Sequence, residues 1–230
     1  AEQAIQGKAA GITVSQPNGA PGAGTTIRVR GTTSLNASNS PLYVVDGVPM
    51  TDIQFLSADD IESLQILKDA SSAAIYGSRA ANGVILITTK QGKNGVAKVA
   101  LNAHYSFNVV RDNQTPLNAK EYKDLMDEIG LVKLPDNLTD VTDWKDEVYR
   151  TGAVQDYQLS ITNGNDKLRY FISGGYTGET GVIKASSFRR YNFRAAIEND
   201  IKPWLRLNAS VAYSDYQWNG TGIISATGSN

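Results

Sequence analysis

The feature that most constrains the fold is the segment PLYVVDGV, residues 41–48. Residues 42–45 are apolar and rich in strand-favouring side chains, which predicts a buried strand. The strand ends at Asp46-Gly47, a dipeptide that accepts the positive φ angles of a tight hairpin turn. The segment therefore predicts a buried strand that turns back on itself.

A second segment, residues 67–93, predicts a helix, a turn and a strand in that order. A helical pattern continues through residues 72–76, and Gly77 and Gly83 then permit sharp reversals of the backbone. The β-branched residues that follow, 84–89, are typical of a strand interior. With the hairpin, this unit predicts a mixed α/β fold for the first half of the chain.

A further helix is expected to begin at Asp59. Asp59 can cap it, and Glu62 stands three residues later, as in a capping box. Ile61, Leu64 and Leu67 recur at helical spacing. We expect this helix to pack on the strands of the first half.

The second half has a different pattern, which starts after the polar, glycine-rich residues 90–95. Apolar and polar side chains alternate from residue 99 to 109, so an extended strand would have one apolar and one polar face. The alternation recurs in four later segments, residues 157–162, 168–173, 191–198 and 205–214. Strands that cross an outer membrane at a tilt have about 9–11 residues. We expect five such antiparallel strands.

The connections alternate in length: long at 111–153, short at 163–167, medium at 177–187 and short at 199–203. Outer-membrane barrels alternate short periplasmic turns with longer external loops. The pattern therefore places the first loop, with a predicted helix at residues 118–129, outside the cell. Aromatic side chains at the two membrane interfaces would include Tyr105, Tyr157, Trp204 and Tyr213.

Periodicity alone leaves a second fold open, because strands of a water-soluble antiparallel sheet also have one apolar and one polar face. The chain would then be a soluble or surface-exposed binding module or adhesin without transport. No apolar run is long enough for a membrane helix, so any membrane span must be made of strands.

The sequence offers no catalytic site. The glycines of GAPGAG, residues 19–24, lack the Lys-Ser/Thr of a phosphate-binding loop and precede a predicted strand. His104 is the only histidine and there is no cysteine, which excludes the usual zinc sites. Ser71, Ser72 and Ser78 lack the strand, elbow and helix context of a hydrolase nucleophile. We expect no enzyme activity, no cofactor and no metal.

The formal charge of −1 gives no electrostatic reason to expect a nucleic-acid partner.

Several segments of the first half resemble the plug domain of TonB-dependent outer-membrane receptors. They are TIRVRG (26–31), LYVVDGVPM (42–50) and ILKDASSAAIYGSRAANGVILITTK (66–90). Together with the upstream IQGKAAGITVSQPNGAPGAG (5–24), they are similar to the SusC/RagA branch, which imports glycans or peptides in Bacteroidetes-type bacteria. The resemblance covers residues 4–93 closely and residues 96–230 more loosely.

The resemblance implies a mixed α/β plug domain at residues 1–93, followed at residues 96–230 by antiparallel strands of an incomplete transmembrane β-barrel. Family members are several times longer and close a barrel of about 22 strands around the plug. We therefore expect this chain to be part of a longer protein.

The resemblance also implies a function and its partners. The expected function is active import of oligosaccharides or peptides through the outer membrane, with the plug gating the lumen. The expected partners are a SusD-like surface lipoprotein, TonB acting through a segment that this chain lacks, and outer-membrane lipid. Pairs of transporter and lipoprotein could form dimers. A transporter whose main output is signalling is an alternative that would need an added N-terminal domain.

A plug inside a polar lumen needs charged groups to hold it there, and breaking a buried ion pair costs about 3–5 kcal/mol. The candidates for holding the plug to the wall are Arg28, Arg30, Asp46, Glu62, Lys68 and Asp69.

Ligand contacts are expected in two plug loops that rise toward the substrate cavity in related vitamin and siderophore receptors. By that resemblance the candidates are Thr33, Ser34, Leu35, Asn36, Asn39, Ser78, Arg79 and Asn82. Amide and hydroxyl side chains suit sugar hydroxyls or peptide groups. They suit ordinary loop turns equally well. Tyr76, in the same region, is expected to be a packed side chain.

Overall fold

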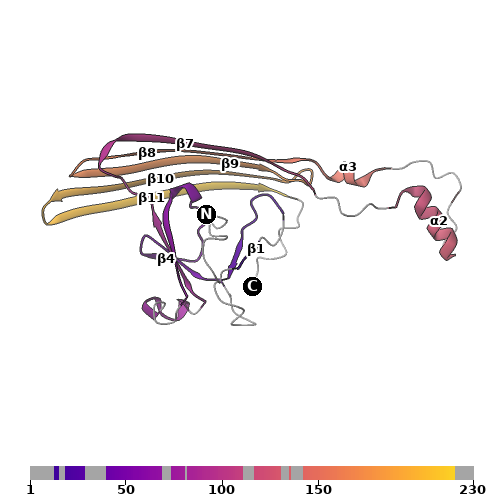
Figure 1. The fold of residues 1–230 in the computed structure, drawn as a ribbon, viewed down its shortest axis with the longest axis horizontal. Coiled ribbons are helices and arrows are strands. Elements are labelled where there is room, and N and C mark those ends of the chain that lie inside the picture. The colour runs from indigo at the N-terminus through magenta and orange to yellow at the C-terminus, as the bar shows by residue number, and fades with distance from the viewer. Residues whose placement is uncertain are drawn as a thin grey trace.

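The computed structural model describes residues 13–15, 19–28, 40–68, 74–80, 82–110, 117–130, 135 and 142–220. In these residues a long five-stranded sheet lies over one side of a small mixed domain (Figure 1). The small domain is built from the first half of the chain and the long sheet from the second.

The small domain contains a four-stranded sheet in the order β4-β3-β6-β5. Its strands are β3 (Leu42–Val45), β4 (Val48–Met50), β5 (Ile61–Leu67) and β6 (Val84–Thr89). The predicted hairpin is confirmed: β3 and β4 are antiparallel, and Asp46 and Gly47 between them have φ angles of 49° and 87°. The predicted strand at 84–89 is also confirmed, and it pairs in parallel with β3.

The core of this domain lies on both faces of the sheet. One face buries Tyr43, Val45, Ile85 and Ile87 against neighbouring apolar residues, and the other buries Leu42, Val44, Ala80 and Val84. Tyr76 packs against the second group, as expected. A separate antiparallel pair is formed by β1 (Thr13–Ser15) and β2 (Thr26–Arg28).

The helix expected from Asp59 is wrong. Ser57 caps a single 3₁₀ turn, η2 (Ala58–Asp60), and the chain then enters β5, antiparallel to β6. The pairing has a bulge between Ile61 and Ser63, so Ile61 and Leu64 both pack on the core although they stand three residues apart. A bulge adds one residue to a strand, and here it imitates helical spacing.

Residues 74–76 of the helix expected at 72–76 have the tighter winding of a 3₁₀ helix. The described part is the 3₁₀ segment η3 (Ala74–Ala80), which is kinked at Gly77, where φ is 70° and ψ is −158°. The expected reversal at Gly77 is therefore present, and Gly83, with a φ of 96°, makes a second one before β6.

The long sheet consists of five antiparallel strands in sequence order. They are β7 (Gly95–Asn108), β8 (Gly152–Gly164), β9 (Leu168–Thr180), β10 (Ser187–Lys202) and β11 (Leu205–Asn219). All five predicted strands are confirmed, but each has 13–16 residues instead of about 9–11. The strands extend at both ends beyond the segments of alternating apolar and polar residues. Backbone hydrogen bonds pair these end residues, so their pairing does not need an apolar face.

The connections have the predicted order of lengths. Two short turns, 165–167 and 203–204, lie at one end of the sheet, which we call the turn end. The connections 109–151 and 181–186 lie at the other, which we call the loop end.

The described residues of the first connection form two helices, and Figure 1 shows them beyond the loop end of the sheet. The predicted helix is confirmed as α2 (Ala119–Ile129), which begins with a capping box between Asn118 and Glu121. The short helix α3 (Trp144–Val148) was not predicted. No helix in the described parts of the chain has the length and apolar content needed to cross a membrane.

Candidate functional site

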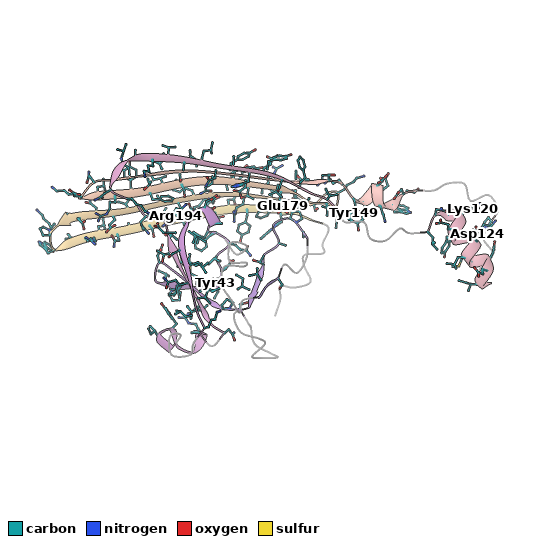
Figure 2. All side chains as sticks on the ribbon, viewed as in Figure 1. Tyr43, Lys120, Asp124, Tyr149, Glu179 and Arg194 are labelled. Carbon is teal, nitrogen blue, oxygen red and sulfur yellow. The ribbon has the colours of Figure 1, made fainter. Side chains whose placement is uncertain are left out.

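The two faces of the long sheet differ in chemistry. On the outer face, Val99, Leu101 and Val211 are 65%, 67% and 59% exposed. The inner face carries mainly polar side chains and lies against the small domain, which we call the plug. Figure 2 shows Arg194 on the sheet above the plug, with Tyr43 in the plug core below.

An aromatic row crosses the outer face near the loop end. Tyr157, Tyr176 and Tyr191 are paired across β8, β9 and β10, with ring centroids 6.5 and 5.1 Å apart. Tyr157 was predicted as an interfacial aromatic residue, whereas Tyr176 and Tyr191 were not. Trp204 lies in the β10–β11 turn at the opposite end and is 81% exposed.

Arg194 of β10 makes the most extensive contact between sheet and plug. Its side chain is 4% exposed, and Nη1 donates to the carbonyl oxygen of Lys90 over 2.8 Å. Nη2 donates to Thr89 Oγ1 and lies 3.8 Å from Asp46 Oδ2. The guanidinium also lies over the ring of Phe171, 5.5 Å from its centroid. One wall side chain therefore binds the hairpin turn and the end of β6.

Asp46 is held in place from within the plug. Oδ1 accepts from the Thr89 amide over 2.9 Å and Oδ2 from the Thr89 hydroxyl over 2.5 Å. The positive φ of Asp46 places its carboxylate over the end of β6, where Arg194 reaches it. The tight turn thus creates the acceptor for the wall arginine.

Asp60 makes a second contact with the wall. It is 2% exposed, and Oδ1 accepts from Gln158 Nε2 over 3.2 Å. Gln158 Oε1 in turn accepts from Asn192 Nδ2 over 3.2 Å. We call these contacts the polar layer: Asp46, Asp60, Thr89 and Lys90 of the plug with Gln158, Asn192 and Arg194 of the wall.

Gly175 makes room for the amides of the polar layer. A Cβ at this position would lie 1.9 Å from Gln158 Oε1 and 2.7 Å from Asn192 Oδ1. We therefore expect Gly175→Ala to push both amides aside and to break the chain from Asn192 to Asp60. An unsatisfied buried polar group costs about 1–3 kcal/mol. Thermal unfolding of the full-length protein would measure this loss.

The matched control is Gly174→Ala in the same strand, because the nearest atom to its Cβ would be a backbone oxygen 3.9 Å away. Equal stability of the Gly175→Ala and Gly174→Ala proteins would contradict a role for the amide chain.

Burial raises the pKa of Asp60, and the nearby Arg194 guanidinium and Gln158 amide only partly oppose this effect. The folded protein therefore binds a proton at Asp60 at a pH where the unfolded chain has lost it. From about pH 4 up to the raised pKa, this residue makes stability fall as pH rises. The charged carboxylate is the form that burial disfavours.

The Asp60→Asn protein should lack this contribution. We expect the stability difference between Asp60→Asn and the unmodified protein to change in favour of the variant as pH rises above about 4. Unfolding temperatures measured at several pH values would give the difference. A difference that does not vary with pH would contradict the raised pKa.

Three further hydrogen bonds between described residues join wall and plug around the polar layer: Asn102 Nδ2 to Asp59 Oδ1 (3.1 Å), Arg190 Nη1 to the Gln54 carbonyl (3.1 Å) and the Gly22 amide to Glu179 Oε2 (2.8 Å). In the link after the plug, Asn94 Nδ2 donates to Asp166 Oδ1 of the β8–β9 turn over 3.2 Å. The interface is therefore polar along much of the inner face.

A cavity of about 450 Å³ lies between plug and wall, on the loop-end side of the polar layer. The plug contributes the backbone of residues 22–25 and residues near 53–59, and the wall contributes Asp156, Thr177 and Arg190 among others. Its lining includes the carboxylates of Asp59, Asp156 and Glu179 and the guanidinium of Arg190.

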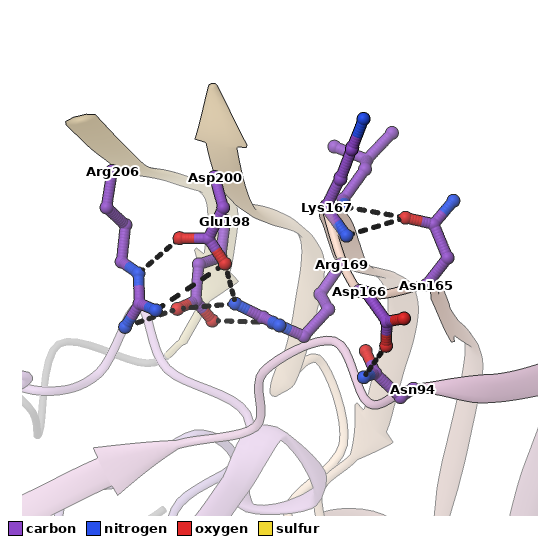
Figure 3. A network of polar contacts seen from close by, with 9 residues as sticks. Asn94, Asn165, Asp166, Lys167, Arg169, Glu198, Asp200 and Arg206 are labelled. Carbon is purple, nitrogen blue, oxygen red and sulfur yellow. Dashed lines mark hydrogen bonds and ion pairs between the residues drawn. The ribbon is translucent and has the colours of Figure 1, made fainter. Parts of the chain in front are cut away.

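A charge cluster lies at the turn end of the sheet (Figure 3). Arg169 pairs with Glu198 and Asp200, both at 2.9 Å, and Arg206 pairs with the same two carboxylates at 3.4 and 2.5 Å. All four residues belong to β9, β10 and β11, so the cluster joins strands of the wall to one another.

The candidates for holding the plug to the wall differ in the contacts that they make. Asp46 contacts the wall through Arg194, whereas Glu62 pairs with Lys93 of its own half of the chain at 2.8 Å. Lys68 is half-buried and makes no ion pair with another described residue. Arg30 and Asp69 lie outside the described residues, as does the side chain of Arg28, whose backbone pairs with Thr13.

Most ligand-contact candidates lie outside the described residues: Thr33, Ser34, Leu35, Asn36 and Asn39, together with the side chain of Ser78. Arg79 is exposed in η3, and Asn82 Nδ2 donates to the Ser40 carbonyl over 3.5 Å. The described candidates are thus close to the turn that precedes β6.

Sequence reasoning missed Asp60, Arg190 and Arg194. Arg194 had a signal, because it occupies a polar position between Phe193 and Ala195, whereas Arg190 directly follows Arg189 and did not stand out in the pattern. Asp60 had none, because its burial depends on the approach of β8.

Comparison with known proteins agrees with this geometry. Residues 1–84 match the family model described as the TonB-dependent Receptor Plug Domain. The TonB-dependent receptor SusC of Bacteroides thetaiotaomicron is 44% identical over 202 residues, which are 83% of this chain and 20% of the relative. The TonB-dependent receptor P3 of Formosa agariphila is 39% identical, over 99% of this chain and 22% of that protein. This chain therefore spans about a fifth of the length of these relatives.

Solved structures agree as well. The RagAB peptide importer in its open-open state matches 96% of this chain and 29% of its own chain, with a TM-score of 0.78 and 28% identity. The ferric enterobactin receptor PfeA of Pseudomonas aeruginosa, at 17% identity and a TM-score of 0.55, shares the fold.

These relatives are receptors and transporters, not enzymes. The plug, the five-stranded wall and these similarities lead to one assignment: the chain belongs to the SusC/RagA type of TonB-dependent receptors, which are outer-membrane proteins.

Proposed function

We propose that the whole protein actively imports oligosaccharides or peptides across the outer membrane. Residues 1–93 would be the plug domain, and residues 96–230 would begin the barrel whose lumen the plug gates. The observation that carries this proposal is the polar layer, in which Arg194 and Gln158 of the wall hold Asp46 and Asp60 of the plug. A polar contact surface suits a plug that separates from the wall and binds it again, because water can replace the hydrogen bonds between them.

The plug has its own apolar core, separate from this contact surface. Ile53, Ile85 and Ile87 are at most 2% exposed and pack on one another within the first half of the chain. The plug could therefore move or be remodelled locally without exposing that core to the wall. On release Arg194 would lose its hydrogen bond to Lys90 and its ion pair with Asp46, so release would need an energy source. TonB, acting on a segment outside this chain, would supply it.

The partners follow from the same proposal. A SusD-like lipoprotein would cover the loop end, where the long connection and α2 extend beyond the sheet (Figure 1). Dimers of such pairs are consistent with this arrangement. The ligand-contact candidates, Thr33, Ser34, Leu35, Asn36, Asn39, Ser78, Arg79 and Asn82, would contact the substrate.

The alternative of a soluble binding module is disfavoured by the outer face. Apolar side chains are exposed across the outer face, from Tyr105 on β7 (55%) through Tyr157 on β8 and Phe193 on β10 (42% and 45%) to Tyr213 on β11 (65%). A water-soluble protein would normally cover so large an apolar surface. Lipid would cover it in an outer membrane.

An uptake experiment tests the proposal. Deleting the gene for the full-length receptor should abolish growth on one class of oligosaccharide or peptide and uptake of its labelled form. Uptake should also stop in wild-type cells when TonB is deleted or when a proton uncoupler is added. A tagged receptor should co-purify with a lipoprotein. TonB-independent uptake, or growth unchanged by the deletion on every oligosaccharide and peptide tested, would contradict active import.

A further inference from the structure

The cavity between plug and wall is lined by aromatic, acidic and basic side chains that take no part in the polar layer. It lies on the loop-end side of that layer and is large enough, at about 450 Å³, for a small-molecule site. We propose that it is a subsite for one neutral sugar unit of an imported oligosaccharide. This inference rests on the proposed import function and selects one of its two substrate classes.

Aromatic rings lie on the inner wall beside the cavity. Phe188, Tyr216 and Trp218 belong to β10 and β11, with Trp218 5.4 Å from Phe188 and 4.8 Å from Tyr216 between ring centroids. Phe188 and Tyr216 line the cavity directly. The inner face of an outer-membrane barrel is normally polar, so these rings have no lipid to face.

Part of this aromatic group packs against the plug, and part of it lines the cavity. Gly22 lies so close that a Cβ would be 2.4 Å from both Phe188 and Trp218. Phe188 is accordingly 8% exposed, and Tyr216 lines the cavity beside it. The C–H groups on one face of a sugar ring carry slight positive charge and fit the electron-rich face of an aromatic ring. Tyr216 offers such a face.

The polar side of the cavity is fixed in orientation. Arg190 Nη2 donates to Thr177 Oγ1 over 3.2 Å, and the Thr177 hydroxyl donates to Asp156 Oδ2 over 2.7 Å. Arg190 Nη1 is held by the Gln54 carbonyl of the plug over 3.1 Å. Donor and acceptor groups thus stand side by side, and a sugar hydroxyl can both donate and accept.

The charges favour a neutral ligand over an anionic one. Asp59, Asp156 and Glu179 line the cavity together with one arginine, Arg190, and with His104. A uronate or sulfated sugar would bring another negative charge toward three carboxylates, and like charges repel strongly in a partly buried site. A neutral sugar has no such cost.

Occupation of the subsite would reach the plug directly. Arg190 binds the Gln54 carbonyl and Glu179 binds the Gly22 amide, so two cavity residues also hold plug backbone. A sugar hydroxyl that competes for Arg190 or Glu179 would weaken these contacts. Binding would therefore loosen the plug on the side from which substrate arrives.

The test uses the full-length receptor without its lipoprotein. An array of neutral glycans (α- and β-glucans, xylan, mannan), acidic glycans (polygalacturonate, alginate, carrageenan) and basic peptides identifies what binds. The neutral oligosaccharide with the strongest signal is then titrated by calorimetry. We expect Tyr216→Ala and Asp156→Asn each to weaken its binding about tenfold, a typical effect for one lost contact. Tyr213→Ala is the matched control, because Tyr213 lies on the opposite face of the same strand and is 65% exposed.

Each outcome decides the matter. Tenfold losses in the two cavity variants with none in Tyr213→Ala support the subsite. Stronger binding of acidic glycans or basic peptides, no neutral glycan bound, or equal affinity of all variants would overturn it. Energy-dependent uptake by the unmodified receptor is measured separately in cells. If uptake persists while the cavity variants bind normally, only the subsite fails, and if uptake does not depend on TonB, the proposed function fails.

Discussion

Replacing Arg194 by alanine is expected to release the plug from the wall. The change removes the donors to Lys90 and Thr89 and takes a positive charge away from Asp46 and Asp60. Removing one partner of a buried ion pair costs about 3–5 kcal/mol, and we expect the lower end of that range because the Asp46 side chain is 29% exposed. We expect a lower unfolding temperature for the full-length receptor and greater sensitivity of cells to vancomycin, which is too large for ordinary porins.

The control for this experiment lies in the same strand. Arg189→Ala removes an exposed arginine from the opposite face of β10, which points away from the described residues of the plug, and should leave both measurements unchanged. Arg194→Lys keeps the charge but not the planar fork, so its effect should be intermediate. Vancomycin sensitivity equal to that of Arg189→Ala, at equal expression, would rule out Arg194 as a residue that holds the plug. Exposed Arg79 is a weaker choice for the same test.

Gly92→Ala is expected to disrupt the joint between plug and barrel. A Cβ at Gly92 would lie 2.1 Å from the Tyr170 nitrogen and 2.6 Å from the Arg169 carbonyl carbon, both backbone atoms of β9. A strand held in ladders on both sides cannot give way as a side chain can, so the link itself would have to move. Overpacking of this kind costs about 1–3 kcal/mol, and we expect the upper end of that range.

Limited proteolysis and thermal unfolding of the full-length Gly92→Ala receptor would detect the change. We expect faster cleavage near the link and a lower unfolding temperature. Gly19→Ala is the matched control, because nothing lies within 4 Å of its added Cβ. Identical cleavage of the two variants would show that the close approach of Gly92 to β9 does not matter.

Local chemistry made part of the fold readable from the sequence. Asp46-Gly47 could be placed in a tight turn because few other dipeptides tolerate its φ angles. The helix that begins after Asn118 was also predictable, because its cap and its apolar face lie within one short segment. The error at Ile61–Leu67 shows the limit, since a bulge against β6 gave strand residues a helical spacing. That bulge depends on a partner strand that the segment itself does not encode.

The contact site was less predictable than the fold, because it joins residues far apart in the chain. Asp46 could be named as a candidate from its charge, but its partner Arg194 stands 148 positions later and was found only when β10 was seen to cross the plug. Glu62 has the same charge and was an equal candidate for holding the plug, yet it pairs with Lys93 of its own half of the chain. Charge alone cannot distinguish these two cases.

The sequence by itself determined the two kinds of unit: period-two alternation sets the faces of the long strands, and turn residues set where the short strands reverse. Only the tertiary structure decided which polar side chains of the wall meet which carboxylates of the plug. The reason is physical. A strand's faces follow from its own residues, whereas the burial of Asp60 and the reach of Arg194 depend on how a separate domain is seated against the sheet.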